Sequence, residues 1–503
     1  MKSFFLTALF AVLYFYVPAQ TDNKIVIGKV DSVYSNILGE KRKVWIYVPG
    51  MNSGNADPGN RYPVLYLLDG DAHFQSVAGM IQQLSEANGN TNCPGMIVVA
   101  IPNTNRTRDL TPTHIVSDLP AMDSNASQNT GGGENFVAFM EKELIPHIDS
   151  LYPTQPYRLL VGHSFGGLTV MNVLTNHTKL FNAYVAIDPS MWYDKERFLK
   201  ATEQKLAQQK YQGIKLYLGI ANTMPGGMSI AKMLKDTTAA TRHIRSIFAL
   251  DTFIKTNKQN SLQFAGKYYA DDDHGSVPLI TEYDALRFIF SYYKYKFTEQ
   301  DFTDSSTAFV TRYKAHYQTV SKELGYSVSP PEVLTNGLAY QSLNSKFIAK
   351  AAAFYKLNLE NYPESSSAYV AYGDFLVLRE DTTNAIAYYQ KAYAINKSDE
   401  TLQKLNSLQG NAVFKLSADQ LQKYAGVYVF ESLSITSAVV LKDGALWIAV
   451  TGQPAYELVP LSPDTFSIKN ISGFKLHFEM DGDKPSTLVS TQPNGTFVGN
   501  LKR

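Results

Sequence analysis

The sequence predicts an α/β fold in its first half: a mostly parallel, doubly wound sheet with helices on both faces. Short apolar runs at residues 64–68 and 96–100 are typical of strands that are covered on both faces. These runs alternate with segments of helical periodicity, for example 135–151, whose apolar residues fall on one stripe. Strands that alternate with helices of this length indicate a mostly parallel sheet.

The other elements of this region follow from the same patterns. Alternating polar and apolar residues predict a half-buried early strand at 43–48, and Pro278 in a first turn predicts a helix over 278–293. We expect a further helix at 165–174 and further strands at 158–161, 183–187, 216–220 and 262–270.

A small helical region is expected after the α/β part, because residues 335–400 contain a period of 34 residues. Ala385 and Tyr389 fall on the spacing of a tetratricopeptide repeat, and Ala351 and Tyr355 lie in register one period earlier. Two copies offer little concave surface. A structural spacer is therefore favoured over a docking surface for a protein partner.

The last part of the chain predicts a small antiparallel β domain. Asp443-Gly444 lies between two apolar runs and is a direct hairpin signal, which Asp481-Gly482 and Asn494-Gly495 repeat. We expect four segments along the chain: a signal peptide at 1–19, an α/β domain at 20–298, a helical region at 299–412 and a β domain at 413–503.

The N-terminus predicts export to the periplasm or the medium. Lys2 precedes an apolar stretch at 4–17, and Val17-Pro18-Ala19 places small residues where a signal peptidase cleaves, before Gln20. A retained membrane anchor is the alternative, but the stretch is short for a span of about 20 residues. Cys93 is the only cysteine, which excludes intrachain disulfides and zinc sites built on cysteine pairs. The net charge of +1 gives no field that would gather nucleic acid or an anionic membrane.

The strongest chemical signal is the segment 162–167, Gly-His-Ser-Phe-Gly-Gly, which follows an apolar strand and opens a helix. This strand–turn–helix context is that of a nucleophile elbow, in which glycines leave room for a strained turn. The elbow presents the Ser164 hydroxyl at the carboxyl edge of the sheet, and the following helix points its N-terminal amides at a developing oxyanion. Ser164 is therefore the predicted nucleophile.

A serine nucleophile needs an adjacent base, and the best candidate among the nine histidines is His274. It lies between a predicted strand and a predicted helix, in a loop at the edge where sheet loops converge. His243 lies inside a predicted helix beside two arginines and is interpreted as a surface residue. His163 belongs to the elbow, and His147 belongs to a helix face.

Three further segments carry a family resemblance: 67–74 (Leu-Leu-Asp-Gly-Asp-Ala-His-Phe), 106–112 (Arg-Thr-Arg-Asp-Leu-Thr-Pro) and 188–192 (Asp-Pro-Ser-Met-Trp). With the elbow, they make residues 28–293 resemble the Putative esterase family of α/β-hydrolases. That family contains siderophore esterases, feruloyl and acetyl-xylan esterases, S-formylglutathione hydrolase and mycolyltransferases. The resemblance implies an oxyanion hole formed by the backbone N–H groups of Asp71 and Phe165.

The chain departs from the family at the acidic member of the triad. The family commonly places Glu or Asp after the strand that is 216–220 here, whereas this chain has Asn222. Asp272, two residues before His274, is the first candidate to orient the histidine. Asn222 as a neutral orienting group and a Ser–His dyad assisted by backbone carbonyls are the alternatives.

These residues predict two-step acyl transfer through an acyl-enzyme, without a metal or an organic cofactor. Trp192 is a candidate for the substrate pocket, and Arg108 for contact with an anionic substrate. A structural role for Arg108, through pairing with Asp109, is favoured over this contact. The substrate is a carbohydrate acyl or feruloyl ester or a siderophore ester. Transfer to an alcohol, and a non-catalytic binding protein on a lapsed core, remain the other hypotheses.

Overall fold

The structure, a computed structural model, describes residues 25–50, 60–115, 127–410, 414–451, 453–469, 471–492 and 495–502. The predicted signal peptide at 1–19 lies outside these residues. The chain divides into two compact units: Met1–Lys294 with Lys322–Tyr326, and Tyr295–Ser321 with Ser327–Arg503. We describe each unit by itself.

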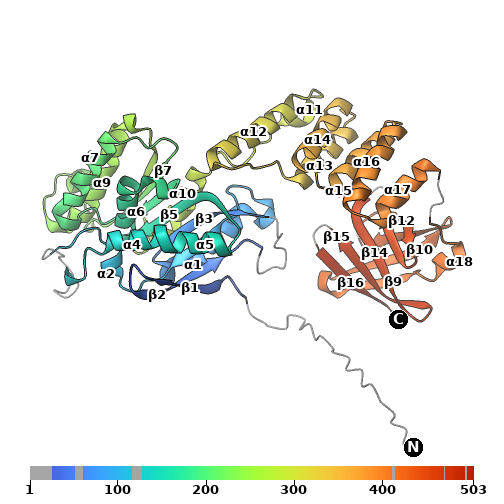
Figure 1. Cartoon of the computed structure of the whole chain (residues 1–503), viewed down its shortest axis with the longest axis horizontal. Helices are drawn as coiled ribbons and strands as arrows, with labels where there is room; N and C mark the ends of the chain where they lie inside the picture. The colour runs from blue at the N-terminus through green and yellow to red at the C-terminus, as the bar shows by residue number, and fades with distance from the viewer. Residues whose placement is uncertain are drawn as a thin grey trace, which may run out of the picture. The chain divides into compact units, whose positions relative to one another are not determined.

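The first unit is built on an eight-stranded sheet of order β1-β2-β4-β3-β5-β6-β7-β8 (Figure 1). Strands β3 to β8 pair in parallel, whereas β1 and β2 pair with each other, and β2 with β4, in antiparallel register. This confirms the predicted mostly parallel sheet. The strands are β1 (Lys29–Ser35), β2 (Glu40–Tyr47), β3 (Tyr62–Leu68), β4 (Ile97–Ile101), β5 (Thr154–His163), β6 (Ala183–Ile187), β7 (Lys215–Ala221) and β8 (Gln263–Tyr269).

Burial explains which strands could be predicted from the sequence. Every residue of β4, β6 and β7 is buried, as expected for apolar runs covered by helices on both faces. Strand β1 was not predicted, because it lies at the sheet edge, most of its residues are partly or fully exposed and it carries no apolar run.

Helices surround this sheet (Figure 1). The predicted helix at 135–151 corresponds to α4, a π-helical turn and α5 in direct succession. The segment at 67–74 comprises the end of β3 and the first turn of α1, a helix that the sequence did not predict. The helices are α1 (Gly70–Ser85), α2 (Arg106–Asp109), α4 (Gly133–Phe139), α5 (Ile145–Leu151), α6 (Phe165–Asn176), α7 (Arg197–Gln208), α8 (Ile230–Met233), α9 (Arg242–Thr256) and α10 (Val277–Ile289).

The second unit begins with helices whose spacing repeats. Helices α13 and α15 begin at residues 332 and 366, and α14 and α16 begin at 348 and 382, a spacing of 34 in both cases. The equivalent residues Ala351 and Ala385 are both fully buried. Assignment to the tetratricopeptide class remains a prediction. The helices are α11 (Glu299–Thr303), α12 (Ala308–Leu324), α13 (Glu332–Asn344), α14 (Ile348–Asn361), α15 (Ser366–Leu378), α16 (Thr382–Ile395), α17 (Asp399–Gln409) and α18 (Ala418–Gln422).

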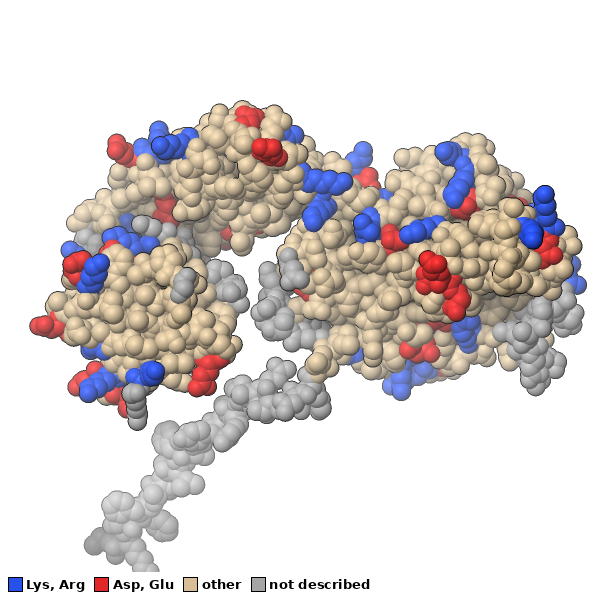
Figure 2. Space-filling view, turned by 180° about the vertical axis from the view of Figure 1, so that it is seen from behind, with Lys and Arg blue, Asp and Glu red and all other residues tan. Residues whose placement is uncertain are grey.

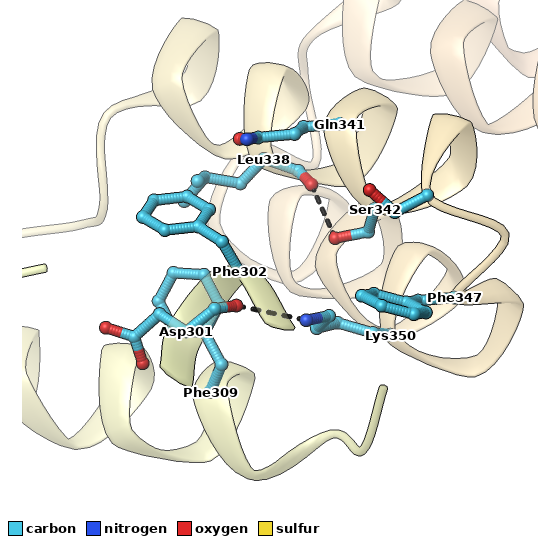
Figure 3. Close-up of a pocket in the computed structure, with 9 residues that line it drawn as sticks. Asp301, Phe302, Phe309, Leu338, Gln341, Ser342, Phe347 and Lys350 are labelled. Carbon is cyan, nitrogen blue, oxygen red and sulfur yellow. Dashed lines mark hydrogen bonds between the residues drawn. The ribbon is translucent and has the colours of Figure 1, made fainter. Parts of the chain in front are cut away.

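A small pocket between these helices is closed around a buried lysine (Figure 3). Lys350 Nζ donates to the backbone carbonyl oxygens of Asp301, at 3.0 Å, and Asp304. It also lies 4.5 Å from the centroid of the Phe347 ring, a cation–π distance. The Asp301 carboxylate instead pairs with Arg312 at 2.5 Å. These contacts satisfy the ammonium group internally, so we interpret the pocket as part of the packing of the helices.

The chain then forms a closed antiparallel barrel of order β10-β11-β12-β13-β14-β15-β16-β9. Asp443 and Gly444, both at positive φ, connect β10 to β11 as predicted. Asn494 lies outside the described residues. Tyr424, Phe466 and Phe478 pack edge-on or tilted in the interior. The strands are β9 (Gly426–Phe430), β10 (Ile435–Lys442), β11 (Ala445–Val450), β12 (Ala455–Ser462), β13 (Thr465–Ile468), β14 (Ile471–Asp481), β15 (Lys484–Gln492) and β16 (Gly495–Leu501).

Acidic and basic side chains are interspersed on the face drawn in Figure 2, in keeping with the net charge of +1. Within the described part of the chain, none of the helices has both the length and the apolar character needed to cross a bilayer.

Candidate active site

Ser164 stands on a strained turn between β5 and α6. Its φ of 59° and ψ of −113° lie outside the regions that L-residues commonly adopt. A Cβ on Gly162 would lie 2.5 Å from the backbone of Gly166, and one on Gly166 would lie 3.0 Å from the Asp69 carboxylate. The glycines are therefore required by close approach, which is the geometry of a nucleophile elbow.

The elbow is hydrogen-bonded to the segment that follows β6. The Ser164 N–H donates to the Ile187 carbonyl at 2.9 Å, and the Ser164 carbonyl accepts from the Ser190 N–H at 3.1 Å. The Ser164 Oγ lies 3.4 Å from the Ser190 Oγ. These bonds fix the nucleophile beside the carboxyl end of β6.

The two predicted oxyanion amides lie in the first turns of two neighbouring helices. Asp71 is in the first turn of α1 and Phe165 in the first turn of α6, and neither helix has a side-chain cap. These helices follow β3 and β5, which pair in parallel with Leu67 opposite Val161. Uncapped first-turn N–H groups at one sheet edge form a ready site for negative charge.

Asp69 and Arg106 tie the α1 turn to the elbow. The buried Asp69 carboxylate accepts from Arg106 Nε at 2.6 Å and Nη2 at 3.0 Å. Arg106 Nη2 also donates to the His163 carbonyl at 3.1 Å. Although burial raises it, hydrogen bonding and charge from Arg106 hold the pKa of Asp69 below its usual range. The ion pair therefore ties together the two turns that carry the predicted oxyanion amides.

The structure gives Arg108 the pairing with Asp109 that the sequence favoured over substrate contact. Its Nε donates to Asp109 and its Nη2 donates to Glu40, both at 2.7 Å. Asp109 also pairs with the buried Arg42 at 2.5 Å. The guanidinium is thus held between two carboxylates, and Arg106 is the arginine that contacts the elbow. Trp192 is partly buried, with its ring centroid 6.2 Å from that of Phe165.

His274 lies in the loop between β8 and α10 and donates from Nδ1 to Asp188 Oδ2 at 2.6 Å. Asp188 follows β6, is fully buried and has a φ of 41°. Its other oxygen accepts from the Ala221 N–H at 3.0 Å. The His274 ring lies 4.4 Å, centroid to centroid, from that of His163, the neighbour of Ser164. Asp188 is therefore the carboxylate that orients the ring of His274, the predicted base, in the turn beside Ser164.

The acid therefore differs from the one that the sequence suggested. Asp272 accepts from the Ser276 hydroxyl at 2.9 Å, and Asn222 donates from Nδ2 to the Ala270 carbonyl at 2.9 Å. Both side chains therefore bond to the segment that carries His274 rather than to the His274 ring. The carboxylate comes from a strand end 86 residues away in sequence. Asp188 was part of the segment 188–192 that carried the resemblance, and its place at the end of a predicted strand was the available signal.

His243, interpreted from the sequence as a surface residue, also contacts the triad acid. Its Nε2 donates to Asp188 Oδ2 at 2.8 Å, from the first turn of α9. Although burial raises it, the hydrogen bonds from His243 and His274 hold the pKa of Asp188 well below its usual range. Asp188 is therefore an anion at any pH where the fold persists. The helical pattern around His243 gave no sign of this contact.

The same three residues have the spacing of a possible metal site. Among the described residues, ligand atoms of Asp188, His243 and His274 all lie within 4.8 Å of one another. Their present separations of 2.6 and 2.8 Å from one oxygen are hydrogen-bond distances. Ligands of a tetrahedral zinc ion lie about 3.3 Å apart, so an ion would have to push these atoms apart. We interpret the group as a hydrogen-bonded cluster.

Further titratable groups lie behind the elbow. Burial lowers the pKa of His163 to about 4, and its Nε2 has no hydrogen-bond partner among the described residues. The His73 ring is 6.0 Å from the His163 ring, and His73 Nδ1 is 3.9 Å from Glu282 Oε1. Burial lowers the pKa of His73 and raises that of Glu282 to about 8. These three groups are therefore neutral near pH 7.

Comparison with known proteins places this site among ester hydrolases. Residues 35–245 match the family described as "Putative esterase". The chain is 28% identical over 209 residues to the ferri-bacillibactin esterase BesA of Bacillus subtilis, covering 39% of this chain and 72% of that protein. It is 30% identical over 158 residues to the apo-salmochelin esterase of Escherichia coli, covering 30% of this chain and 46% of that protein.

A solved structure shows the same likeness in three dimensions. The crystal structure of an IroE-like serine hydrolase from Shewanella oneidensis is 30% identical, with a TM-score of 0.53. The match covers 66% of this chain and 99% of that chain.

Proposed function

The chain belongs to the Putative esterase family of carboxylic-ester hydrolases, and on this premise we propose that it is an exported esterase that hydrolyses siderophore esters through Ser164, His274 and Asp188. The observation that carries this function is the 2.6 Å contact between His274 Nδ1 and Asp188 Oδ2 beside the elbow. It fixes the tautomer in which His274 Nε2 is free to accept a proton.

The reaction proceeds in two steps on the residues of this chain. His274 Nε2 takes the Ser164 proton as Oγ attacks the ester carbonyl, and the amides of Asp71 and Phe165 stabilise the oxyanion. The tetrahedral intermediate collapses, and the leaving alcohol departs with the proton from His274. Water then attacks the acyl-enzyme with His274 again as base, and Ser164 is regenerated. Asp188 stabilises the imidazolium in both steps.

Two observations support a siderophore ester over other esters. The two relatives named above carry siderophore substrates in their names. The elbow also combines rings with a cation, because the Arg106 guanidinium lies 5.6 Å from the centroid of the Phe165 ring, near Trp192. Phe165 is buried and Arg106 is paired with Asp69, so the partly buried Trp192 is the ring of this group that could contact an aromatic acyl group such as a catecholate.

Substrate preference tests this function. We expect kcat/KM for bacillibactin and enterobactin to exceed that for methyl ferulate and p-nitrophenyl acetate at least tenfold, with iron-free and iron-loaded forms assayed separately. Preference for methyl ferulate or for the acetyl ester would overturn the siderophore assignment. Added glycerol is expected to leave the free acid as the main product, whereas accumulation of the glycerol ester would identify an acyltransferase.

Labelling with a fluorophosphonate tests the nucleophile without any choice of substrate. Wild type and Ser150→Ala, a change of an exposed serine on α5, should be labelled, and Ser164→Ala should not. Labelling that survives Ser164→Ala would contradict the assignment. No labelling of wild type would favour a non-catalytic protein.

Export is proposed from the N-terminal sequence, since residues 1–19 lie outside the described residues. The positive Lys2, the apolar stretch and the small residues before Gln20 support cleavage. Mass spectrometry of the protein made in its native cell should find a chain that begins at Gln20 outside the cytoplasm. A cytoplasmic chain that keeps Met1 would overturn this part.

A further inference from the structure

Two histidines share one oxygen of a single buried carboxylate. His274 Nδ1 lies 2.6 Å and His243 Nε2 lies 2.8 Å from Asp188 Oδ2, and their ring centroids are 5.2 Å apart. Asp188 is fully buried, so its negative charge is balanced by these donors and by the Ala221 N–H on Oδ1. An ionised carboxylate only accepts hydrogen bonds, so both rings must present an N–H to it.

We propose that His243 is a positioning residue of the triad, which holds the Asp188 carboxylate for His274 and, when protonated, competes with His274 for its charge. This rests on the proposed function of His274 as the base. His243 does not act on the substrate; it acts through Asp188.

The positioning role follows from where the three donors originate. The Ala221 N–H lies at the end of β7, His243 lies in the first turn of α9, and His274 lies in the loop after β8. Without His243, Oδ2 keeps a single donor, and that donor is the ring that must move a proton during catalysis. A second, fixed donor holds Oδ2 in place while His274 changes charge, as outer hydrogen-bond partners do at metal-bound histidines.

The competition follows from charge. In the transition state His274 is an imidazolium, and the Asp188 anion beside it is the main stabilising group. A neutral His243 donates a hydrogen bond and leaves that anion available. A protonated His243 would place a positive charge 2.8 Å from the same oxygen. The His243 Nδ1 is buried without a hydrogen-bond partner among the described residues, so protonation there also buries an unsatisfied N–H.

Three titratable groups lie near this pair and are neutral near pH 7. From β5, His163 faces His274, and behind it lie His73 of α1 and Glu282 of α10. Burial lowers the pKa of both His163, to about 4, and His73, and raises that of Glu282 to about 8.

The remaining charged side chains near this pair either form ion pairs or are in contact with solvent. Asp69 is paired with Arg106, and Arg242, next to His243, lies 4.0 Å from Glu196. Asp272 and Asp273 of the His274 loop are exposed or nearly so and bond to Ser276. The proposal therefore predicts that the acid limb of activity depends on both His243 and His274, because each bonds to the same carboxylate oxygen.

The test is the pH dependence of kcat and kcat/KM for wild type, His243→Gln and His243→Phe in the full chain, between pH 4.5 and 9. His147→Gln is the matched control. His147 is 23% exposed and pairs with Asp31 at 3.1 Å, and His243 is similarly 22% exposed and pairs with an aspartate. In wild type and the control, activity should fall over a wider pH range on the acid side than a single ionisation would produce. His243→Gln keeps an N–H donor without a titrating ring, so its limb should narrow to a single ionisation.

The two substitutions separate positioning from charge. His243→Phe removes the donor and should lower kcat at pH 8 by about 10- to 100-fold with KM changed less than about twofold, the range seen for outer-shell hydrogen-bond partners. His243→Gln should recover at least part of that loss. Wild-type kcat and a wild-type acid limb in both variants would overturn the proposal.

The rate of fluorophosphonate labelling of Ser164 gives a second readout that needs no substrate. It should follow the same pH dependence in the same variants. If siderophore esters are not hydrolysed but labelling follows His243 as expected, the substrate assignment fails and this inference stands. If labelling is indifferent to both His243 variants while Asp188→Asn abolishes it, the triad stands and this inference fails.

Discussion

The hydrolase unit and the barrel both contain residues at positive φ, but they use this backbone shape in opposite surroundings. Asp69, Ser164 and Asp188 adopt positive φ at the carboxyl ends of β3, β5 and β6. In the barrel, Ser434 and Asp443 do so in exposed connections between strands. Strain in a hairpin is the ordinary cost of a tight connection, whereas strain at three neighbouring sheet ends, with two buried carboxylates, marks a site.

The interiors differ in the same way. The barrel is filled with rings such as Tyr428, Phe466 and Phe478, and its core is apolar apart from a few hydroxyl groups. The hydrolase unit buries Asp69, Asp188 and Glu282 at or behind one sheet edge. Burial of charge destabilises a fold unless it is compensated. The hydrolase unit therefore buries carboxylates near its candidate site at a cost in stability, whereas the described core of the barrel contains no buried carboxylate.

Asp188→Asn should break the catalytic side of this comparison and is the largest effect we expect. The amide cannot balance the His274 imidazolium, so kcat should fall about 10⁴-fold. Steady-state kinetics at pH 8 measure this. Asp272→Asn is the control and should change kcat by less than about threefold. The opposite ranking of the two variants would return the orienting role to Asp272.

Phe478→Ala should break the other side. Removing a buried ring lowers the free energy of unfolding of the barrel by about 3–5 kcal/mol, while kcat/KM should stay within about twofold of wild type. Urea denaturation with activity assayed in parallel gives both numbers. Val498→Ala, on the half-exposed β16, should cost less than about 0.5 kcal/mol. A parallel fall in kcat/KM at denaturant concentrations where the variant is still folded would show that the barrel supports the site.

Glu282→Gln tests the buried carboxyl group of the hydrolase unit through the pH dependence of the free energy of unfolding. Burial raises the pKa of Glu282 from 4.5 to about 8, so the folded state holds its proton while the unfolded chain releases it. The wild type therefore keeps full stability below about pH 4.5 and loses it progressively as pH rises toward 8.

Glutamine carries no such proton. Its stabilising effect relative to wild type should therefore grow by on the order of 2–4 kcal/mol between pH 5 and pH 8. Urea denaturation at the two pH values measures this difference. The exposed Glu141→Gln should show no such growth. An equal effect of Glu282→Gln at both pH values would mean that the carboxylate is ionised in the folded state.

Lys404→Gln should have the smallest effect, because it breaks a partly exposed pair in the helical unit. Lys404 lies 2.6 Å from Asp374, and both side chains keep contact with solvent. The expected cost is about 0.2–1 kcal/mol and should shrink in high salt. Arg106→Gln leaves the buried Asp69 charge unbalanced and should cost about 3 kcal/mol or more. Thermal denaturation of the two variants at low and high salt compares the pairs, and equal costs would contradict the contrast.

Local sequence patterns were sufficient where the structure is itself local. The elbow needs six consecutive residues, and the clash that requires Gly162 involves Gly166, four positions away. Phe165 begins α6, as the predicted elbow requires, whereas the oxyanion role of the Asp71 and Phe165 amides came from the family resemblance and stays a prediction. Strand β1 and helix α1 were missed, because an edge strand has no apolar run and the α1 segment was interpreted as a loop.

The sequence by itself determined the sheet class, the turn that carries Ser164 and the loop that carries His274, because short-range sterics and apolar periodicity encode all three. Only the tertiary structure decided that Asp188 is the carboxylate bonded to His274 and that His243 bonds to it as well. Those contacts join residues 86 and 55 positions apart. They exist because β6, β7 and β8 lie side by side in parallel and end at one edge, which no local pattern records.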